Sequence, residues 1–291
     1  AAGSSMDGTL SGVGTTWAGG GTFDDGTSTL VMSGSSKNIT FTGNEGVQNL
    51  TVNGTCTFNS LSSTGAALVL SGALVLGGSG TLTSAADQEL EMGTASQTIT
   101  LSNLTGLSAL SKLRFTHGSG STNLPACTTE RVFVDSSGGT VVATGNHTIT
   151  EELSIVSGGT FNANGNTIAA KNVDVNGGTL NLSNSALNFS VTSSGDIFTM
   201  DASSTLTTGN TTITGYSSGA KTLTAFAPSG GHEVVGDVKW LSSDTDSDLT
   251  VIGAVIDCDA SASGANIRQW HHTLDTQQLL DADEAGDDDM K

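Results

Sequence analysis

Three segments near the middle of the chain carry almost the same sequence: GGTVVATGNHTI (138–149), GGTFNANGNTI (158–168) and GGTLNLSNSALNF (177–189). A Gly-Gly pair opens each one and is followed by Thr140, Thr160 or Thr179, so the unit is roughly 20 residues long. A unit this short cannot bury an apolar face alone and must stack on its neighbours. Its apolar residues alternate with Asn, Ser and Gly, as in strands with one buried face. Each unit therefore predicts one coil of a parallel β-helix, or β-solenoid.

A second repeat lies upstream of the first. The segment TLVMSGSSKNITF (29–41) aligns without gaps on ELEMGTASQTITL (89–101), so that Thr29 falls on Glu89. Because this offset equals three units of roughly 20 residues each, we expect the two segments to lie in the same phase of the stack. Clusters of Gly, Asn and Ser between the strands supply corners where the chain can turn without strain. About ten coils over residues 15–230 would make a rod on the order of 50 Å long.

The composition supports an ordered β protein rather than a flexible linker. Gly, Ser and Thr make up 120 of the 291 residues, which is also typical of linkers, but 35% of the residues are hydrophobic. The formal net charge of −19 would repel phosphate backbones and anionic lipids, so we expect no nucleic-acid partner and no membrane insertion. No apolar run approaches the length that a membrane-spanning helix needs.

The repeat pattern divides the chain into three parts. We predict an N-terminal segment at 1–14, solenoid repeats at 15–229, and a terminal coil, cap and acidic C-terminal tail at 230–291. The stretch 103–131 fits the pattern worst and holds two of the three Arg residues, so we expect a protruding loop or a bulged coil there. At the C-terminus, LDTQQLLDADEAGDDDMK (274–291) has helix-capping signals and predicts a short helix.

Three cysteines, Cys56, Cys127 and Cys258, are widely separated and show no metal-binding spacing. Their odd number argues against a disulfide scaffold. We interpret them as small buried hydrophobic residues in strands, and one disulfide with one free thiol is the alternative.

An acidic segment near the C-terminus partly matches a calcium-binding loop. Asp281, Asp283 and Asp287 surround Gly286, and Ca²⁺ prefers several hard oxygen ligands on a tight Gly turn. The fifth position of such a loop is Ala285, however, and the eighth is an Asp instead of an aliphatic residue. We interpret the segment as a solvated acidic tail, with Ca²⁺ as the alternative and no other cofactor predicted.

Asp257 and Asp259 are the sharpest catalytic candidates. They flank Cys258 in an expected strand, so both carboxylates would point to the same face, as a glycoside hydrolase requires. We interpret both as solvent-exposed side chains, because the chain has few aromatic residues on which a sugar could stack.

Two further polar clusters have simpler interpretations. His271 and His272 with Asp275 could bind a metal, but adjacent residues of a strand point to opposite faces, so we expect a cap surface. Asp24 and Asp25 are expected to form a turn. No nucleotide-binding loop, hydrolase elbow or zinc motif is present in the sequence.

The N-terminal part resembles the repeat regions of large bacterial and phage surface proteins. The residues that carry this resemblance are Trp17, Gly21-Thr22-Phe23 and Asn49-Leu50-Thr51-Val52-Asn53-Gly54, within a match over about residues 10–230. The resemblance implies a β-solenoid used as an adhesin stalk, a fibre or a virion appendage, and it carries over no catalytic residue. The C-terminal stretch 264–291 departs from the pattern and resembles a module of a phage structural protein.

These observations together predict a non-enzymatic structural protein of an extracellular fibre, filament or virion appendage, located outside the cell, at the cell surface or on a virion. The expected partners are other copies of the chain, head-to-tail or side-by-side, because terminal coils offer unpaired strand edges. Surface glycans are further expected partners. The alternatives are a polysaccharide-degrading β-helix of the glycoside hydrolase or lyase type and a passive glycan-binding adhesin stalk.

Overall fold

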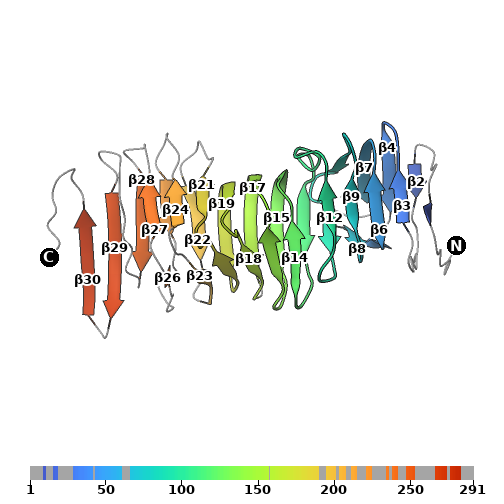
Figure 1. Cartoon of the computed structure of the whole chain (residues 1–291). Coiled ribbons are helices and arrows are strands. Elements are labelled where there is room, and N and C mark those ends of the chain that lie inside the picture. The colour runs from blue at the N-terminus through green and yellow to red at the C-terminus, as the bar shows by residue number, and fades with distance from the viewer. Residues whose placement is uncertain are drawn as a thin grey trace. The chain divides into compact units, whose positions relative to one another are not determined.

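The computed structural model consists of β-strands joined by turns (Figure 1). It describes the backbone of residues 9–10, 16–18, 29–41, 43–60, 66–156, 158–189, 195–200, 203–207, 211–214, 221–224, 234–235, 238–241, 247–252, 266–273 and 276–282. Side chains are described for residues 29–41, 43–59, 66–156, 158–189, 198–200, 203–207 and 211. No helix occurs among these residues, so the described part of the chain contains no helix that could cross a membrane. The chain forms two compact units, Ala1–Thr148 and Ile149–Lys291.

Unit 1 contains three larger parallel sheets, and the chain visits them in rotation, one strand at a time. The β3 sheet consists of β1 (Thr9–Leu10), β3 (Thr29–Met32), β6 (Asn49–Val52), β9 (Leu74–Leu76) and β12 (Ile99–Leu101). The β4 sheet consists of β2 (Thr16–Ala18), β4 (Lys37–Phe41), β7 (Thr55–Ser60) and β10 (Thr81–Ser84). The β11 sheet contains, in unit 1, β5 (Glu45–Val47), β8 (Ala67–Leu70), β11 (Glu89–Met92), β13 (Lys112–Phe115) and β15 (Cys127–Asp135). Strands β14 (Ser121–Leu124) and β16 (Thr140–Ala143) of unit 1 pair in parallel within a further sheet.

Unit 2 also alternates between sheets along the chain. The β20 sheet consists of β18 (Thr160–Asn162), β20 (Thr179–Asn181), β23 (Thr205–Thr207) and β26 (Val234–Val235). Strand β19 (Thr167–Asn176) serves two faces, since its first half pairs with β21 (Ala186–Phe189) and its second half with β22 (Gly195–Met200). Parallel pairing continues from β21 through β24 (Thr211–Thr214) to β27 (Val238–Leu241), and from β22 through β25 (Lys221–Thr224) and β28 (Ser247–Ile252) to β29 (Asn266–Thr273). The unit boundary falls within β17 (His147–Val156). Each unit is a parallel β-helix, which confirms the predicted fold class.

The core of each unit is a set of apolar ladders in which each side chain stacks on its counterpart one coil away. In unit 1, Leu30, Leu50 and Leu74 are paired in register and are at most 4% exposed. In unit 2, Phe161, Leu180 and Leu206 form the corresponding ladder. Burying one such side chain stabilises the fold by about 1.5–3 kcal/mol, so the stack as a whole supplies what no single coil could.

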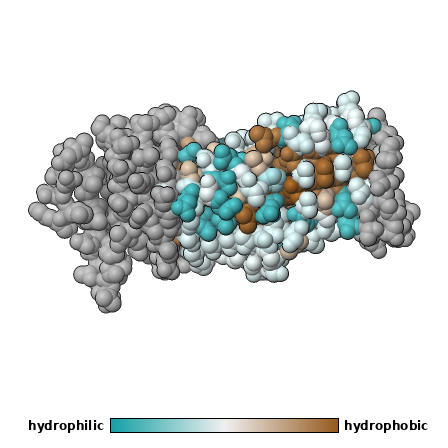
Figure 2. Space-filling model, in the orientation of Figure 1, coloured by the Kyte–Doolittle hydropathy of each residue, from teal (hydrophilic) through white to brown (hydrophobic). Residues whose placement is uncertain are grey.

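The outer faces differ from one sheet to another. Figure 2 shows apolar residues gathered over part of unit 1, and the outward row of the β3 sheet contains the half-exposed Val31 and Val75 with Thr51 between them. On the β4 sheet the outward row is polar, and the hydroxyls of Thr57 and Thr83 lie 2.8 Å apart in hydrogen-bond contact. Period-2 alternation thus sends one set of side chains inward and leaves the other to define each face.

The Gly-Gly pair of the repeat has a local explanation in unit 2. Gly177 has φ = 76°, a conformation that residues with a Cβ rarely adopt. A Cβ on Gly178 would lie 2.5 Å from Cγ2 of Ile155 and 2.9 Å from the carbonyl oxygen of Gly159, so only glycine fits there. Gly177 therefore allows the chain to turn, and Gly178 allows the neighbouring coil to pack closely against it.

Coil length varies more than the repeat predicts. Thr160 pairs with Thr179, which confirms the spacing of the repeat there, but the next partner of Thr179 is Thr205, so the following coil is longer. In unit 1 the ladder partners Leu50, Leu74 and Ile99 also enclose coils longer than the repeat unit.

The prediction that residues 29–41 and 89–101 share one phase is therefore wrong. The first segment forms β3 and β4, and the second forms β11 and β12. The strands that the alignment superposes lie in different sheets, because β11 is not in the β3 sheet and β12 is not in the β4 sheet. Because the coils of unit 1 are longer than the repeat unit, the offset between the two segments is not a whole number of coils. The two segments share a corner motif, not a position in the coil.

The expected irregularity at 103–131 occurs over part of that range. After β12 the chain makes turns through residues 102–111, where Leu104 is 60% exposed. The rest of the range, for which a protruding loop or a bulged coil was expected, forms β13, β14 and the beginning of β15. The two Arg residues taken as a sign of disruption lie in these strands, and both form ion pairs.

The predicted helix over 274–291 is wrong where the structure describes it. Thr276–Ala282 form strand β30, which pairs antiparallel with β29 in the register Thr273↔Thr276. A single short helix is marginally stable in water, whereas a second strand satisfies the open backbone edge of β29. Tertiary pairing therefore overrides the local capping signals.

Candidate functional site

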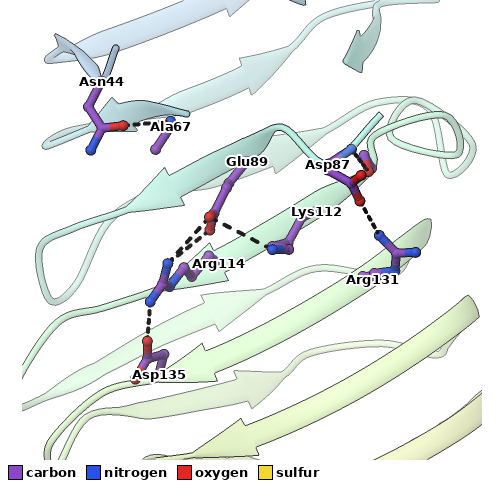
Figure 3. A network of polar contacts seen from close by, with 9 residues as sticks. Asn44, Ala67, Asp87, Glu89, Lys112, Arg114, Arg131 and Asp135 are labelled. Atoms are coloured by element: carbon purple, nitrogen blue, oxygen red, sulfur yellow. Dashed lines mark hydrogen bonds and ion pairs between the residues drawn. The ribbon is translucent and has the colours of Figure 1, made fainter. Parts of the chain in front are cut away.

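The densest cluster of charged side chains in the described residues lies on the outer face of the β11 sheet in unit 1 (Figure 3). Parallel register places Glu89 beside Lys112 and Arg114 beside Phe133 on neighbouring strands. We call Glu89, Lys112, Arg114 and Asp135 the charge network. Its members come from three strands, β11, β13 and β15, so the stacking of coils assembles it.

Arg114 is the centre of the charge network. Its Nη1 donates a hydrogen bond to Oε2 of Glu89 at 3.1 Å, and its Nη2 donates to Asp135. Lys112 approaches the other oxygen of Glu89, with Nζ 3.7 Å from Oε1. The Glu89 side chain is only 8% exposed, so its charge depends on these two cations. The guanidinium therefore links three successive strands of the sheet.

The electrostatics follow from this geometry. Partial burial lowers the pKa of Arg114, but the carboxylates of Asp135 and Glu89 outweigh burial and hold that pKa above its ordinary value. Nζ of Lys112 also lies 4.8 Å from the centre of the Phe133 ring, which is within cation–π range. A second ion pair joins Arg131 Nη1 to Oδ1 of Asp87 at 3.3 Å in unit 1.

Acids and bases in the charge network are paired with one another. Glu89 and Asp135 are both bound to Arg114, and the hydroxyl of Thr116 donates to Glu91 at 2.8 Å. The carboxylates of the network are paired with its cations and so join successive coils, whereas Nε of Arg114 has no hydrogen-bond partner among the described residues. The charge network can fix the register of β11, β13 and β15.

A second polar cluster is buried inside the same coils. The Sγ of Cys127 lies 3.5 Å from Nδ1 of His147, one coil away, and both residues are at most 3% exposed. Burial lowers the pKa of His147 to about 4 and raises the pKa of Cys127 to about 12. At neutral pH the pair is therefore an uncharged thiol beside an uncharged imidazole, which is unsuited to nucleophilic catalysis.

Further polar groups share this interior. Within the described residues, neither ring nitrogen of His117 has a hydrogen-bond partner, and neither do Nε2 of His147 and the hydroxyls of Thr122 and Thr129. Burial lowers the pKa of His117 too. The interior of residues 117–147 thus contains several buried polar atoms, a kind of group that ordinarily has a hydrogen-bond partner in a folded protein.

The residues singled out from sequence lie mostly beyond what the structure describes. Asp257, Asp259, Asp283, Asp287, Asp24, Asp25, Asp275 and Cys258 lie outside the described residues. Asp281 lies in β30 opposite Arg268 of β29, and His271 and His272 lie in β29; only their backbones are described. The buried state expected for Cys56 and Cys127 is confirmed, and both are free thiols. Within the described side chains, no group of three or more His, Cys, Asp or Glu could hold a metal ion.

Sequence reasoning missed the charge network. Its signal is the pair of alternating charges at Lys112 and Arg114, one coil after Glu89 and Glu91. Detecting it requires the actual register, because a coil of the repeat's own length, roughly 20 residues, places these charges out of step. Comparisons with known proteins add no second route to a site: no family model, no curated protein and no solved structure matches the chain.

Proposed function

We propose that the protein is a non-enzymatic structural element, a β-solenoid section of an extracellular fibre, filament or virion appendage. The observation that carries this proposal is the stacked, buried apolar ladder in each unit, which gives a stiff scaffold. The resemblance to bacterial and phage surface repeats supports the same role.

Assembly through chain ends is the natural mode for such an element. In unit 2, β30 is the last strand of its sheet and has one partner among the described strands, β29. Its sequence, TQQLLDA, contains no Lys or Pro and a single charged residue, Asp281, so little in the strand protects this edge from pairing with another chain. We propose that this edge pairs with another copy of the chain.

Negative-stain electron microscopy at rising protein concentration tests this assembly. We expect single particles to give way to end-to-end chains, and we expect Gln277→Lys/Leu279→Lys to abolish the chains by placing charge along β30. The matched control is Ser137→Lys, which adds positive charge at an exposed turn of unit 1 and should leave the chains intact. Single particles at every concentration would contradict assembly through the ends.

A further inference from the structure

Unit 1 has a break in its strand ladders, and a pocket lies at that break. Among the described strands, β12 ends the β3 sheet and pairs only with β9, while β14 begins the next sheet and pairs with β16. Between them lies a half-open pocket of about 330 Å³, which is lined by Ser96, Gln97, Thr98, Ile99, Ser121 and Asn123. This volume is at the lower end of the range of small-molecule sites, roughly 300–1,000 Å³.

The wall of the pocket is held in place by main-chain contacts. The amide Nε2 of Gln97 donates to the carbonyl oxygens of Leu70 and Gly72 at 2.7 and 2.9 Å, and its Oε1 accepts from the amide of Thr94 at 3.1 Å. Ser96 has φ = 60°, a conformation uncommon for a residue with a side chain. The three hydrogen bonds of Gln97 therefore hold this wall of the pocket in place.

One end of the break is closed and the other is open. The amide of Ser96 donates to the carbonyl oxygen of Ser121 at 3.0 Å, which holds the two segments together at that point. Beyond it, Thr98 and Asn123 are exposed and line the pocket from opposite sides of the break. An extended peptide would have to pair along a strand edge that is open at both ends. The hydrogen bond between Ser96 and Ser121 closes one end of this break, so a compact ligand fits the pocket better.

The chemistry of the lining points to the ligand class. Ser96, Thr98 and Ser121 offer hydroxyls and Asn123 offers a carboxamide, so donors and acceptors are both present. None of the six lining residues is charged, in a chain whose net charge is −19. A neutral ligand with many hydroxyls matches this set, whereas an anion would meet an unfavourable field.

We propose that this pocket binds one neutral pyranose ring, either a free sugar or a residue of a glycan. The hydroxyls of the sugar exchange hydrogen bonds with Thr98 and Asn123 across the break, and Ile99 contacts the apolar edge of the ring. No aromatic side chain lines the pocket, so we expect affinity in the millimolar range. This binding is separate from the structural role and does not depend on end-to-end assembly.

Saturation-transfer NMR with a panel of methyl glycosides tests the proposal. The panel contains the methyl glycosides of glucose, galactose, mannose and N-acetylglucosamine, with methyl glucuronide as the anionic comparison. We expect ring-proton saturation for at least one neutral member and none for the glucuronide. Thr98→Val/Asn123→Ala should weaken binding roughly tenfold, because each lost hydrogen bond reduces affinity several-fold.

The matched control is Thr100→Val, which changes an exposed residue of the same strand, β12, outside the pocket lining. It should bind like the unaltered chain. Ser121→Tyr provides a second test, because its ring would fill the pocket and should abolish saturation even if the double variant folds poorly. Urea midpoints confirm that each variant is folded.

Two outcomes overturn the proposal: no saturation for any neutral glycoside, or equal saturation in the unaltered chain and the Ser121→Tyr variant. Pull-down on immobilised dextran and galactomannan separates the two sources of ligand. Retention there identifies a glycan residue, and binding of the methyl glycoside alone identifies a free sugar. Failure of sugar binding with intact end-to-end chains would remove this site and leave the structural role standing.

Discussion

Residues 112–147 of unit 1 and residues 158–189 of unit 2 use the same kind of coil but have different interiors. In unit 2 the one buried polar side chain of this range is Ser185, which donates to the carbonyl of Ser183 and accepts from the amide of Gly165. In unit 1, His117, Thr122, Thr129 and His147 are buried with polar atoms that have no partner among the described residues.

The difference shows how much of a β-helix is decided by repetition. Where the repeat is regular, Asn162 and Asn181 each accept a hydrogen bond from the amide two positions further on, and these turns set the corners. In unit 1 the charge network joins β11, β13 and β15, and the buried polar groups lie in coils that keep the length of the repeat, since Leu113 pairs with Val132 and Thr122 with Val141. Such departures from local rules concentrate at functional sites, and the proposed sugar pocket lies beside them.

Truncating a core ring in each region gives the largest expected effect. Phe161→Ala should lower the free energy of unfolding by about 3–5 kcal/mol, because it leaves a cavity in a closely packed apolar interior. Phe115→Ala should cost less, since its ring lies 6.5 Å from that of His117 and water entering the cavity could bond the imidazole. Urea denaturation measures the free energy of unfolding of each variant, and hydrogen exchange shows in which unit the stability is lost.

Phe161→Leu serves as the control for the core truncations, with a loss below about 1.5 kcal/mol because volume is nearly conserved. Equal losses for the two alanine variants would show that the interiors do not differ in the way the buried polar groups imply.

Acid should destabilise unit 1 through His147. Its pKa is about 4 in the folded chain and near the ordinary value of 6.5 when unfolded, so the unfolded chain binds the proton more tightly. The stability is therefore present above pH 6.5 and is lost as the pH falls from 6.5 to 4, by about 3 kcal/mol in all. Hydrogen exchange of unit 1 amides at pH 7 and pH 4.5 measures this loss.

His147→Leu removes the titrating group while keeping the site filled, so the pH dependence between 6.5 and 4 should flatten. An unchanged slope in this variant would assign the acid sensitivity to other groups, with His117 the first to test.

Removing the central cation of the charge network should have the smallest effect of the three. Arg114→Met leaves the nearly buried Glu89 with only Lys112 and strips Asp135 of its ion pair, at a cost of about 1–3 kcal/mol. Lys171→Met breaks a single pair with Glu151 in unit 2 whose side chains are 39% and 43% exposed, and should cost about 0–0.5 kcal/mol. Urea midpoints at low and high salt compare the two.

Double-mutant cycles between Arg114 and each carboxylate would then separate pairing from lost packing. If Arg114→Met lowered the free energy of unfolding no more than Lys171→Met does, the charge network would not hold the coils of the β11 sheet together.

Local patterns predicted local structure well in this chain. The alternation in TLVM (29–32) placed Leu30 and Met32 inward and Val31 outward, as the structure has them. The Gly-Gly-Thr repeat placed Thr160 and Thr179 in register. These inferences hold because a strand's two faces and a corner's φ angles depend on residues that are adjacent in sequence.

Predictions that needed a global coil length failed. The segments 29–41 and 89–101 were assigned to one phase, yet Leu30 and Leu90 lie in different sheets, because the coils between them are longer than the repeat unit. Where a helix was expected over 274–291, the described residues form β30 instead. Pairing with the open edge of β29 stabilises this segment more than helix-capping residues do. Neither the charge network nor the pocket could be located without the true register.

The sequence by itself determined that this chain stacks short alternating strands into a parallel β-helix, and it determined which residues of each strand face inward. Tertiary structure alone decided which coil lies beside which, and so brought Glu89 to Arg114 and left β12 and β14 apart with a pocket between them. The physical reason is that a side chain's face is set by its immediate neighbours, whereas a parallel ladder joins residues a whole coil apart, and the coils differ in length. Each residue added at a corner therefore changes which residues pair in every later strand.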